Sequence, residues 1–169
     1  RVAAVLQQGL LAPLDALAEQ DGWAQRFTRA ALDAVRINGR LYALPLSTYA
    51  WGLYYRRSLF RDLRLQPPST WAQWLDVNDR LRAVGVAPLI VGAQDAWTLG
   101  AWFDYLNLRL HGKRFHAELL AGRQSWNDPR VGTVLRHWQQ LCLRGDFHAD
   151  SARQGWRQVL PYVSRGAVG

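Results

Sequence analysis

The chain has 169 residues, and its 21 lysine and arginine side chains against 13 aspartates and glutamates give a formal charge of +8. Hydrophobic residues make up 49% of the chain and charged residues 20%, a composition that excludes an intrinsically disordered protein. No run approaches the roughly 18 apolar residues of a membrane-spanning helix, and the single cysteine, Cys142, excludes an internal disulfide or a multi-cysteine zinc site.

The basic residues are spread along the chain and are not gathered into a patch. All but Lys113 are arginine, and the only adjacent arginine pair is Arg56–Arg57. Nucleic-acid surfaces usually concentrate their cations, so we expect a solvated basic surface and no nucleic-acid partner, with charge-driven binding of an anionic polymer as an alternative. The sequence lacks methionine and a signal-peptide pattern, and we expect it to be a central portion of a longer protein.

The first third of the chain predicts short helices followed by a hairpin. Apolar spacing and breaker residues predict helix over 2–11, 15–18 and 23–32. Asn38-Gly39 is a strong tight-turn signal, because both residues tolerate positive φ. The aromatic and apolar segments that follow predict an extended segment over 41–46 and a strand over 49–55.

The remainder predicts mainly helices with one buried strand. Thr70 and Asp128 precede helical patterns over 71–84 and 129–143, and Gly85 and Gly145 follow them as helix-ending residues. The other segments expected from pattern are a strand over 87–91 and helices over 58–63, 98–110, 115–120 and 151–164. Helices alternating with a few short strands indicate an α/β fold.

Four segments in series carry a family resemblance: residues 38–46 (NGRLYALPL), 51–60 (WGLYYRRSLF), 67–74 (PPSTWAQW), and 146–150 with 165–169 (DFHAD and RGAVG). In this order and spacing they resemble the NGKLYALP, YYNKDLF, PPTTWDEL and GKAAM regions of extracytoplasmic solute-binding proteins of ABC sugar importers. This is the family that includes maltose-binding protein. Arg56-Arg57 stand where typical members have lysine or asparagine.

The resemblance implies a helix-rich part of a two-lobe periplasmic-binding-protein type II fold, with few strands. It implies that residues 1–47 end the first lobe, that Leu46 and Ser47 belong to the hinge, and that residues 48–169 form much of the second lobe. It further implies a non-enzymatic receptor without a cofactor, whose partners are a sugar or oligosaccharide and the permease subunits of an ABC importer. The expected location is periplasmic or extracellular, with a lipid anchor ahead of this chain as one form of attachment.

A sugar-binding site needs aromatic side chains that stack on the apolar C–H faces of the sugar and polar side chains that hydrogen-bond to its hydroxyls. After the predicted strand over 87–91, Asp95 and Trp97 supply both types, at the strand end where open α/β sheets tend to bind ligands. Trp102 is a third candidate, although its place on the apolar helix face also predicts core packing. For Asp95 and Trp97, the alternatives are a helix cap and a core indole.

The second group of candidate contacts follows the predicted hinge. Tyr49 and Trp51 alternate with Ala50 along the expected strand, so at least one of them should face the cleft. Thr48 is either a hinge residue or a hydroxyl partner. The resemblance favours Tyr49 as the sugar contact. The remaining tryptophans, Trp156 the least clearly, are expected to pack in the core.

The sequence provides little support for catalysis or metal binding. Asp95 and Asp104 are imaginable as a glycoside hydrolase pair, which keeps a carbohydrate-active enzyme as an alternative. His111 and His116 lie in a polar stretch and are expected to be exposed, and Cys142, between two leucines, is expected to be a buried thiol. The sequence has no glycine-rich phosphate loop, and we expect no metal site.

Overall fold

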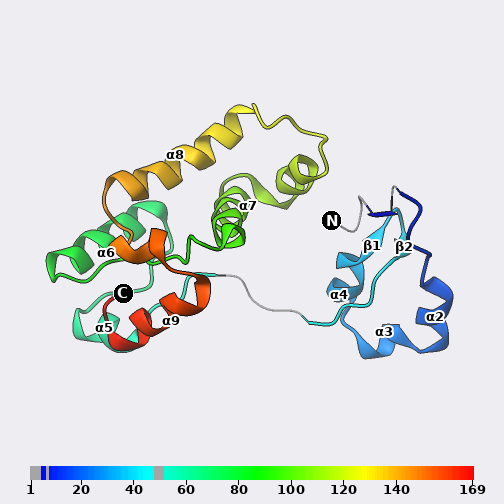
Figure 1. Ribbon diagram of the computed structural model, residues 1–169, viewed down its shortest axis with the longest axis horizontal. Coiled ribbons are helices and arrows are strands. Elements are labelled where there is room, and N and C mark those ends of the chain that lie inside the picture. The colour runs from blue at the N-terminus through cyan, green and yellow to red at the C-terminus, as the bar shows by residue number, and fades with distance from the viewer. Residues whose placement is uncertain (1–4, 7, 48–51) are drawn as a thin grey trace. The chain divides into compact units, whose positions relative to one another are not determined.

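The computed structural model describes residues 5–6, 8–47 and 52–169 (Figure 1). Of the helix expected over 2–11, residues 2–4 and 7 lie outside the described part of the chain, residues 5–6 are helical, and residues 8–11 are not. Contacts divide the chain into two compact units, Arg1–Trp51 and Gly52–Gly169. Each unit packs around hydrophobic residues of its own.

Residues 8–47 of the first unit contain short helices and a hairpin: α2 (Asp15–Gln20), α3 (Trp23–Arg26), α4 (Arg29–Ala34), β1 (Arg36–Ile37) and β2 (Arg40–Leu41). Its core is formed by Ala18, Trp23 and Leu41. The predicted turn is confirmed, with φ of 50° at Asn38 and 82° at Gly39 between the paired strands. These positive angles are those that a two-residue hairpin turn requires.

The single helix expected over residues 23–32 is wrong, because two helices occupy this stretch. Phe27 and Thr28 are extended, with ψ of 149° at both. The Thr28 hydroxyl accepts a hydrogen bond from the Ala31 backbone N–H at 3.3 Å and so begins α4. The hydrogen bond from the Thr28 side chain therefore starts a new helix at this point, and the preceding helix does not continue through it.

The second unit is built from helices: α5 (Arg57–Asp62), α6 (Trp71–Ala83), α7 (Ala96–Leu120), α8 (Pro129–Leu143), the 3₁₀ helix η1 (Ala149–Arg153) and α9 (Trp156–Arg165). The helices expected from residues 71 and 129 are confirmed, and Thr70 and Asp128 cap them through their side chains. The two helices expected over 98–110 and 115–120 are joined in α7, which is kinked at Gly112. The stretch expected to be one helix over 151–164 is divided between η1 and α9.

Two apolar clusters hold this unit together. One joins α5 to α6 through Phe60, Leu65, Val77 and Leu81. The other joins the C-terminal half of α7 to α8 through Phe115, Leu119 and Val131. Both clusters follow from apolar residues three or four apart on facing helices.

The expected strands are largely wrong as continuous elements. Residues 87–91 contribute only single parallel bridges, from Ala87 to Val168 and from Leu89 to Phe147. The described part of the stretch over 49–55, residues 52–55, contains no strand, and the strand within 41–46 is limited to Leu41. An extended segment becomes a strand only where a neighbour completes its backbone ladder, and the described residues provide that neighbour at few positions.

Candidate functional site

The loop over residues 92–95 is fixed to the segment that precedes α9. Backbone N–H groups of Ala93 and Gln94 donate to the carbonyls of Ser151 and Gln154 at 2.9 and 3.2 Å. Gly92 is buried at this contact, and a Cβ there would overlap the backbone of Trp156. Only glycine permits this close approach of two backbones.

Asp95 links the loop to the first turn of α9. Its Oδ2 accepts a hydrogen bond from the backbone N–H of Trp156 at 2.7 Å and lies where a Cβ on Gly155 would be 2.9 Å away. A carboxylate is stabilised by the free N–H groups of a helix N-terminus. Asp95 also precedes α7, but its side chain makes no capping hydrogen bond to that helix. The described residues place no hydrogen bond on its other oxygen, Oδ1.

Trp97 and Trp156 form an exposed indole pair beside Asp95. Their ring centroids are 6.1 Å apart with an angle of 70° between the planes. Trp97 is 51% exposed and Trp156 is 39% exposed, so neither indole is sealed in the core. The guanidinium carbon of Arg157 lies 5.1 Å from the centroid of the Trp156 ring. We call Asp95, Trp97, Trp156 and Arg157 the indole site.

Helix α9 is held in place by a second polar contact, at Tyr162. The Tyr162 hydroxyl donates to Oδ2 of Asp150 in η1 at 2.7 Å, and this bond is the main cause of a raised pKa for Tyr162. The Tyr162 ring also packs edge-on against His148 at 4.9 Å. The orientation of Trp156 therefore depends on contacts at both ends of its helix.

The other predicted contacts are placed differently. Trp102 stacks on Trp74, with centroids 6.1 Å apart and planes 13° apart, and meets Phe147 edge-on at 5.2 Å. These contacts are those of helix packing, so we do not include Trp102 in the indole site. Thr48, Tyr49 and Trp51 lie outside the described residues. Of the predicted hinge residues, Leu46 is 90% exposed and Ser47 is exposed.

Trp156 is the residue that sequence reasoning missed, since it was expected to pack in the core. Its partners Asp95 and Trp97 precede it by about 60 positions, and no local pattern joins them. The preceding Gly155, which leaves room for the Asp95 carboxylate, is the only signal in the sequence for this contact. Trp126 was also expected to pack; it contacts Phe103 at 5.4 Å but is 55% exposed.

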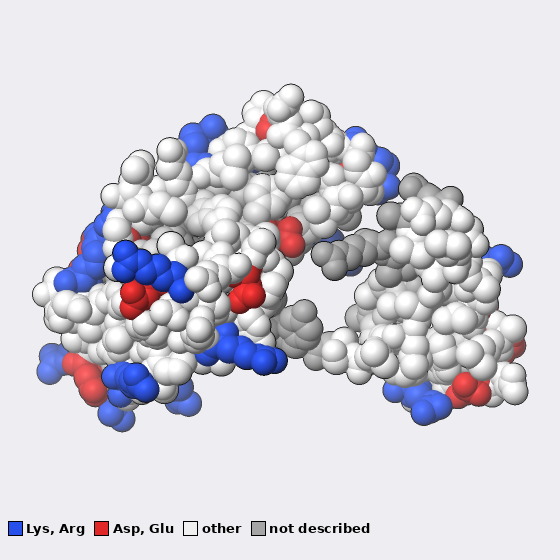
Figure 2. Space-filling model, viewed as in Figure 1, with Lys and Arg blue, Asp and Glu red and all other residues white. Residues whose placement is uncertain are grey.

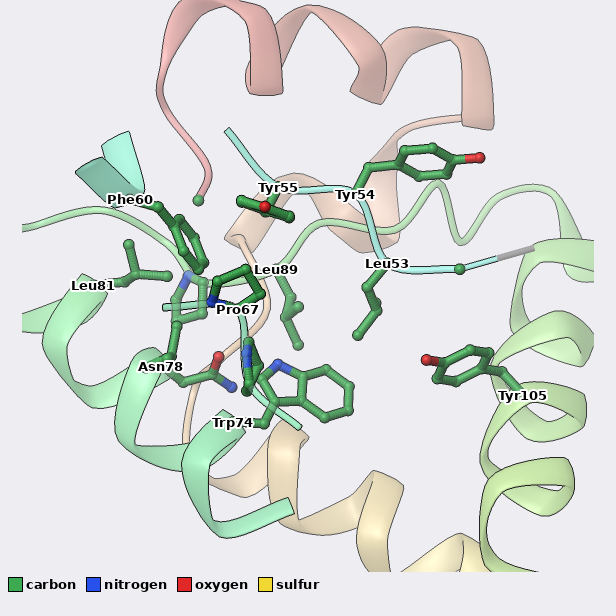
Figure 3. Close-up of a pocket in the computed structure, with 15 residues that line it drawn as sticks. Leu53, Tyr54, Tyr55, Phe60, Pro67, Trp74, Asn78, Leu81, Leu89 and Tyr105 are labelled. Carbon is green, nitrogen blue, oxygen red and sulfur yellow. The ribbon is translucent and has the colours of Figure 1, made fainter. Parts of the chain in front are cut away.

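A separate pocket of about 320 Å³ lies in the second unit, and it includes none of the indole site (Figure 3). Its walls combine apolar side chains, Leu53, Phe60 and Leu89 among them, with the indole of Trp74 and the phenols of Tyr54, Tyr55 and Tyr105. Its buried amide, Asn78, already donates to Asp146 at 3.1 Å. We do not include this pocket in the indole site.

Two expectations about reactive side chains are wrong. Cys142 is exposed, because α8 turns Leu141 and not its neighbour toward the core. The His116 side chain is only 13% exposed, because it contacts Asn107 across the kink in α7. Within residues 5–6, 8–47 and 52–169, no three histidine, cysteine or acidic side chains are grouped to hold a metal ion.

On the face drawn in Figure 2, the basic side chains of the second unit are interrupted by acidic and neutral ones and form no continuous stripe. None of the helices in the described residues combines the length and apolarity needed to cross a bilayer.

The model of one protein family, described as bacterial extracellular solute-binding protein, matches residues 1–169. The chain belongs to this family. An ABC transporter extracellular-binding protein from Pyrococcus horikoshii is 26% identical over 129 residues, which cover 75% of this chain and 31% of that relative. The multiple sugar-binding protein of Streptococcus mutans is 27% identical over 67 residues, or 40% of this chain and 16% of that protein.

Solved structures agree with this family assignment. The bacterial solute receptor AcbH, described as exclusive for β-D-galactopyranose, superposes with a TM-score of 0.83 at 26% identity and covers all of this chain and 43% of its own. A chitin oligosaccharide binding protein superposes with a TM-score of 0.86 at 22% identity, over 99% of this chain and 42% of its own, which shows the shared fold. The chain thus spans less than half the length of the solved structures it matches.

Proposed function

We propose that this chain is part of a saccharide receptor that serves an ABC importer. The observation that carries the proposal is the exposed pair of Trp97 and Trp156, set at an angle beside the carboxylate of Asp95. Family membership and the likeness to AcbH, a galactopyranose receptor, support the same function.

The chemistry of a pyranose fits the indole site. One apolar face of the sugar stacks on an exposed indole, which removes C–H surface from water. Hydroxyls on the rim of the sugar bond to Oδ1 of Asp95 as an acceptor and to the guanidinium of Arg157 as a donor. Asp95 has a second task, because its other oxygen holds the backbone N–H of Trp156 and thereby orients that indole.

We further propose that residues 1–47 end one lobe, that Leu46 and Ser47 lie in the hinge, and that residues 48–169 form much of the other lobe. The division of the chain into two compact units with a boundary at residues 51–52 supports this assignment. Thr48, Tyr49 and Trp51 then lie next to the hinge and contact the sugar from that side. The sugar is bound between the lobes.

The proposed setting is outside the cytoplasm, in the periplasm or at the cell surface, where a lipid anchor is one means of attachment. The receptor delivers its sugar to the permease subunits of the importer and catalyses no reaction. Membership of an extracellular solute-binding family supports this setting. The proposed receptor uses no cofactor.

The test is a calorimetric and tryptophan-fluorescence titration of the purified protein with galactose, raffinose, stachyose, chito-oligosaccharides and xylo-oligosaccharides. We expect saturable binding to at least one of them, a shift in indole emission, and no product after prolonged incubation. Trp97→Ala and Trp156→Ala should each weaken binding about 5- to 150-fold, from loss of about 1–3 kcal/mol of stacking and burial. Trp126→Ala, a variant of an exposed tryptophan outside the site, is the matched control.

Three results contradict the proposal. If none of these saccharides binds, or if Trp126→Ala weakens binding as much as Trp97→Ala, the indole site is not a sugar site. If a glycoside is hydrolysed and Asp95→Asn abolishes the hydrolysis, the protein is a carbohydrate-active enzyme.

A further inference from the structure

An open face of α7 continues from the indole site. Trp97, Gly100, Ala101 and Asp104 share this face, since they follow one another at spacings of three and four residues. Gly100 is exposed, and a Cβ added there would meet no atom within 4 Å. Among the described residues, space is therefore open at Gly100, midway along a face that extends about 10 Å along the helix axis from Trp97 to Asp104.

Asp104 lies at the far end of this face and is held there by a chain of polar contacts. Its side chain is 47% exposed, and its Oδ1 is 3.8 Å from Nε2 of His116. The Asn107 amide, which is fully buried, donates from Nδ2 to Nδ1 of His116 at 3.1 Å.

The kink in α7 is what assembles this chain of contacts. In a straight helix, Asn107 and His116 would be about 13 Å apart along the axis. Gly112, with φ of 78° and ψ of 169°, breaks the helical path between them and returns His116 toward the first half of the helix. A buried amide and a largely buried imidazole thus support one half-exposed carboxylate on the face that carries Trp97.

We infer that Asp104 is a second saccharide-binding carboxylate and that the ligand is an oligosaccharide of at least two pyranose units. This inference rests on the proposed function of the indole site. The first sugar unit stacks at Trp97, and the next extends over Gly100, so that one of its hydroxyls donates to Oδ2 of Asp104. His116 is a positioning residue that fixes the other oxygen of the carboxylate.

The experiment compares saccharides of one linkage in increasing length. The best-binding series from the titration above is measured by calorimetry as the mono-, di- and trisaccharide. In the unmodified protein, we expect the di- or trisaccharide to bind about tenfold more tightly than the monosaccharide, the effect of one hydrogen bond to a charged group. Asp104→Ala should remove most of this advantage and leave the monosaccharide affinity within about twofold.

Two further variants separate positioning from folding. His116→Gln keeps an N–H donor and should retain most of the length advantage, whereas His116→Leu should lose it. Asp76→Ala, which removes an exposed carboxylate of α6, is the matched control and should leave both affinities unchanged. The monosaccharide affinity reports in each variant whether the indole site is still folded.

The outcomes that overturn the inference differ from those that overturn the proposed function. If the monosaccharide binds as tightly as the longer sugars, or if Asp104→Ala weakens all lengths equally or none, the inference is wrong and the indole site stands. If no saccharide of any length binds, the proposed function is wrong and this inference with it.

Discussion

Asp146 is the buried charge on which the packing of α6 against the end of α8 depends. It is fully buried and accepts hydrogen bonds from Arg82 Nη1 at 2.5 Å, Arg144 Nε at 3.2 Å and Asn78 Nδ2 at 3.1 Å. Both arginines also pair with Asp79 on α6. The substitution Asp146→Ala removes the carboxylate and leaves all three donors without their common acceptor.

The expected loss follows from the exposure of the partners. Removing one member of a buried ion pair costs about 3–5 kcal/mol of unfolding free energy. The Arg82 and Arg144 side chains are 30% and 25% exposed, so water reaches part of each guanidinium, and Asp79 still pairs with both. These features reduce the penalty, and we expect about 3 kcal/mol for Asp146→Ala. Asp146→Asn retains one acceptor oxygen and should cost about 1–2 kcal/mol.

Urea unfolding followed by far-UV circular dichroism measures this loss. A decrease of about 3 kcal/mol corresponds to a midpoint shift of about 1–2 M urea. The control is Asp62→Ala, because Asp62 is 64% exposed and pairs only with the neighbouring Arg61 in the described structure. Exposed pairs contribute at most about 1 kcal/mol. If Asp146→Ala shifts the midpoint no more than Asp62→Ala does, the buried network does not stabilise the fold as argued.

Three further predictions concern single residues. The Arg130 guanidinium lowers the pKa of Asp128 to about 2. The stabilisation from this carboxylate is therefore complete above pH 4 and disappears as pH falls through 2. Arg130→Gln should raise the pKa of Asp128 toward 3.8 in an NMR titration. Gly92→Ala should cost about 1–3 kcal/mol in urea unfolding, because the added methyl group overlaps the backbone of Trp156; an unchanged midpoint would contradict this packing. Cys142 is exposed, but partial burial raises the pKa of its thiol; it should therefore react with a thiol reagent in the folded protein, more slowly than in urea because less of it is thiolate, and complete protection from the reagent would show it to be buried.

The features that could be predicted from the sequence are those fixed by neighbouring residues. Thr70 caps α6 through the backbone N–H of Gln73 at 3.2 Å, three residues away, and Asp128 caps α8 two residues away. The turn at Asn38-Gly39 likewise depends only on the φ angles that these two residues tolerate. Local competition also explains the helix boundary that was missed, since the Thr28 cap acts within four residues.

The strands could not be predicted in the same way, because a strand is defined by a partner. Residues 87–91 have the composition of a buried strand, yet only Ala87 and Leu89 find bridging partners in the described structure, at Val168 and Phe147. These partners are about 60 to 80 positions away in the sequence. Apolar composition shows that a segment is buried, but it does not show which backbone lies beside it.

The indole site has one part that neighbouring residues predict and one part that depends on contacts between distant segments. Asp95 and Trp97 were predicted together, because two residues separated by one position after an extended segment stay close in any fold. Trp156 joins them only through the close backbone approach at Gly92 and the hydrogen bond to Asp95. A carboxylate chosen from the sequence as a sugar acceptor therefore also orients one of the two indoles. The sequence around Asp95 shows a carboxylate that could accept a sugar hydroxyl. Its second role, orienting Trp156, exists only because α9 begins within reach of the loop that carries Asp95.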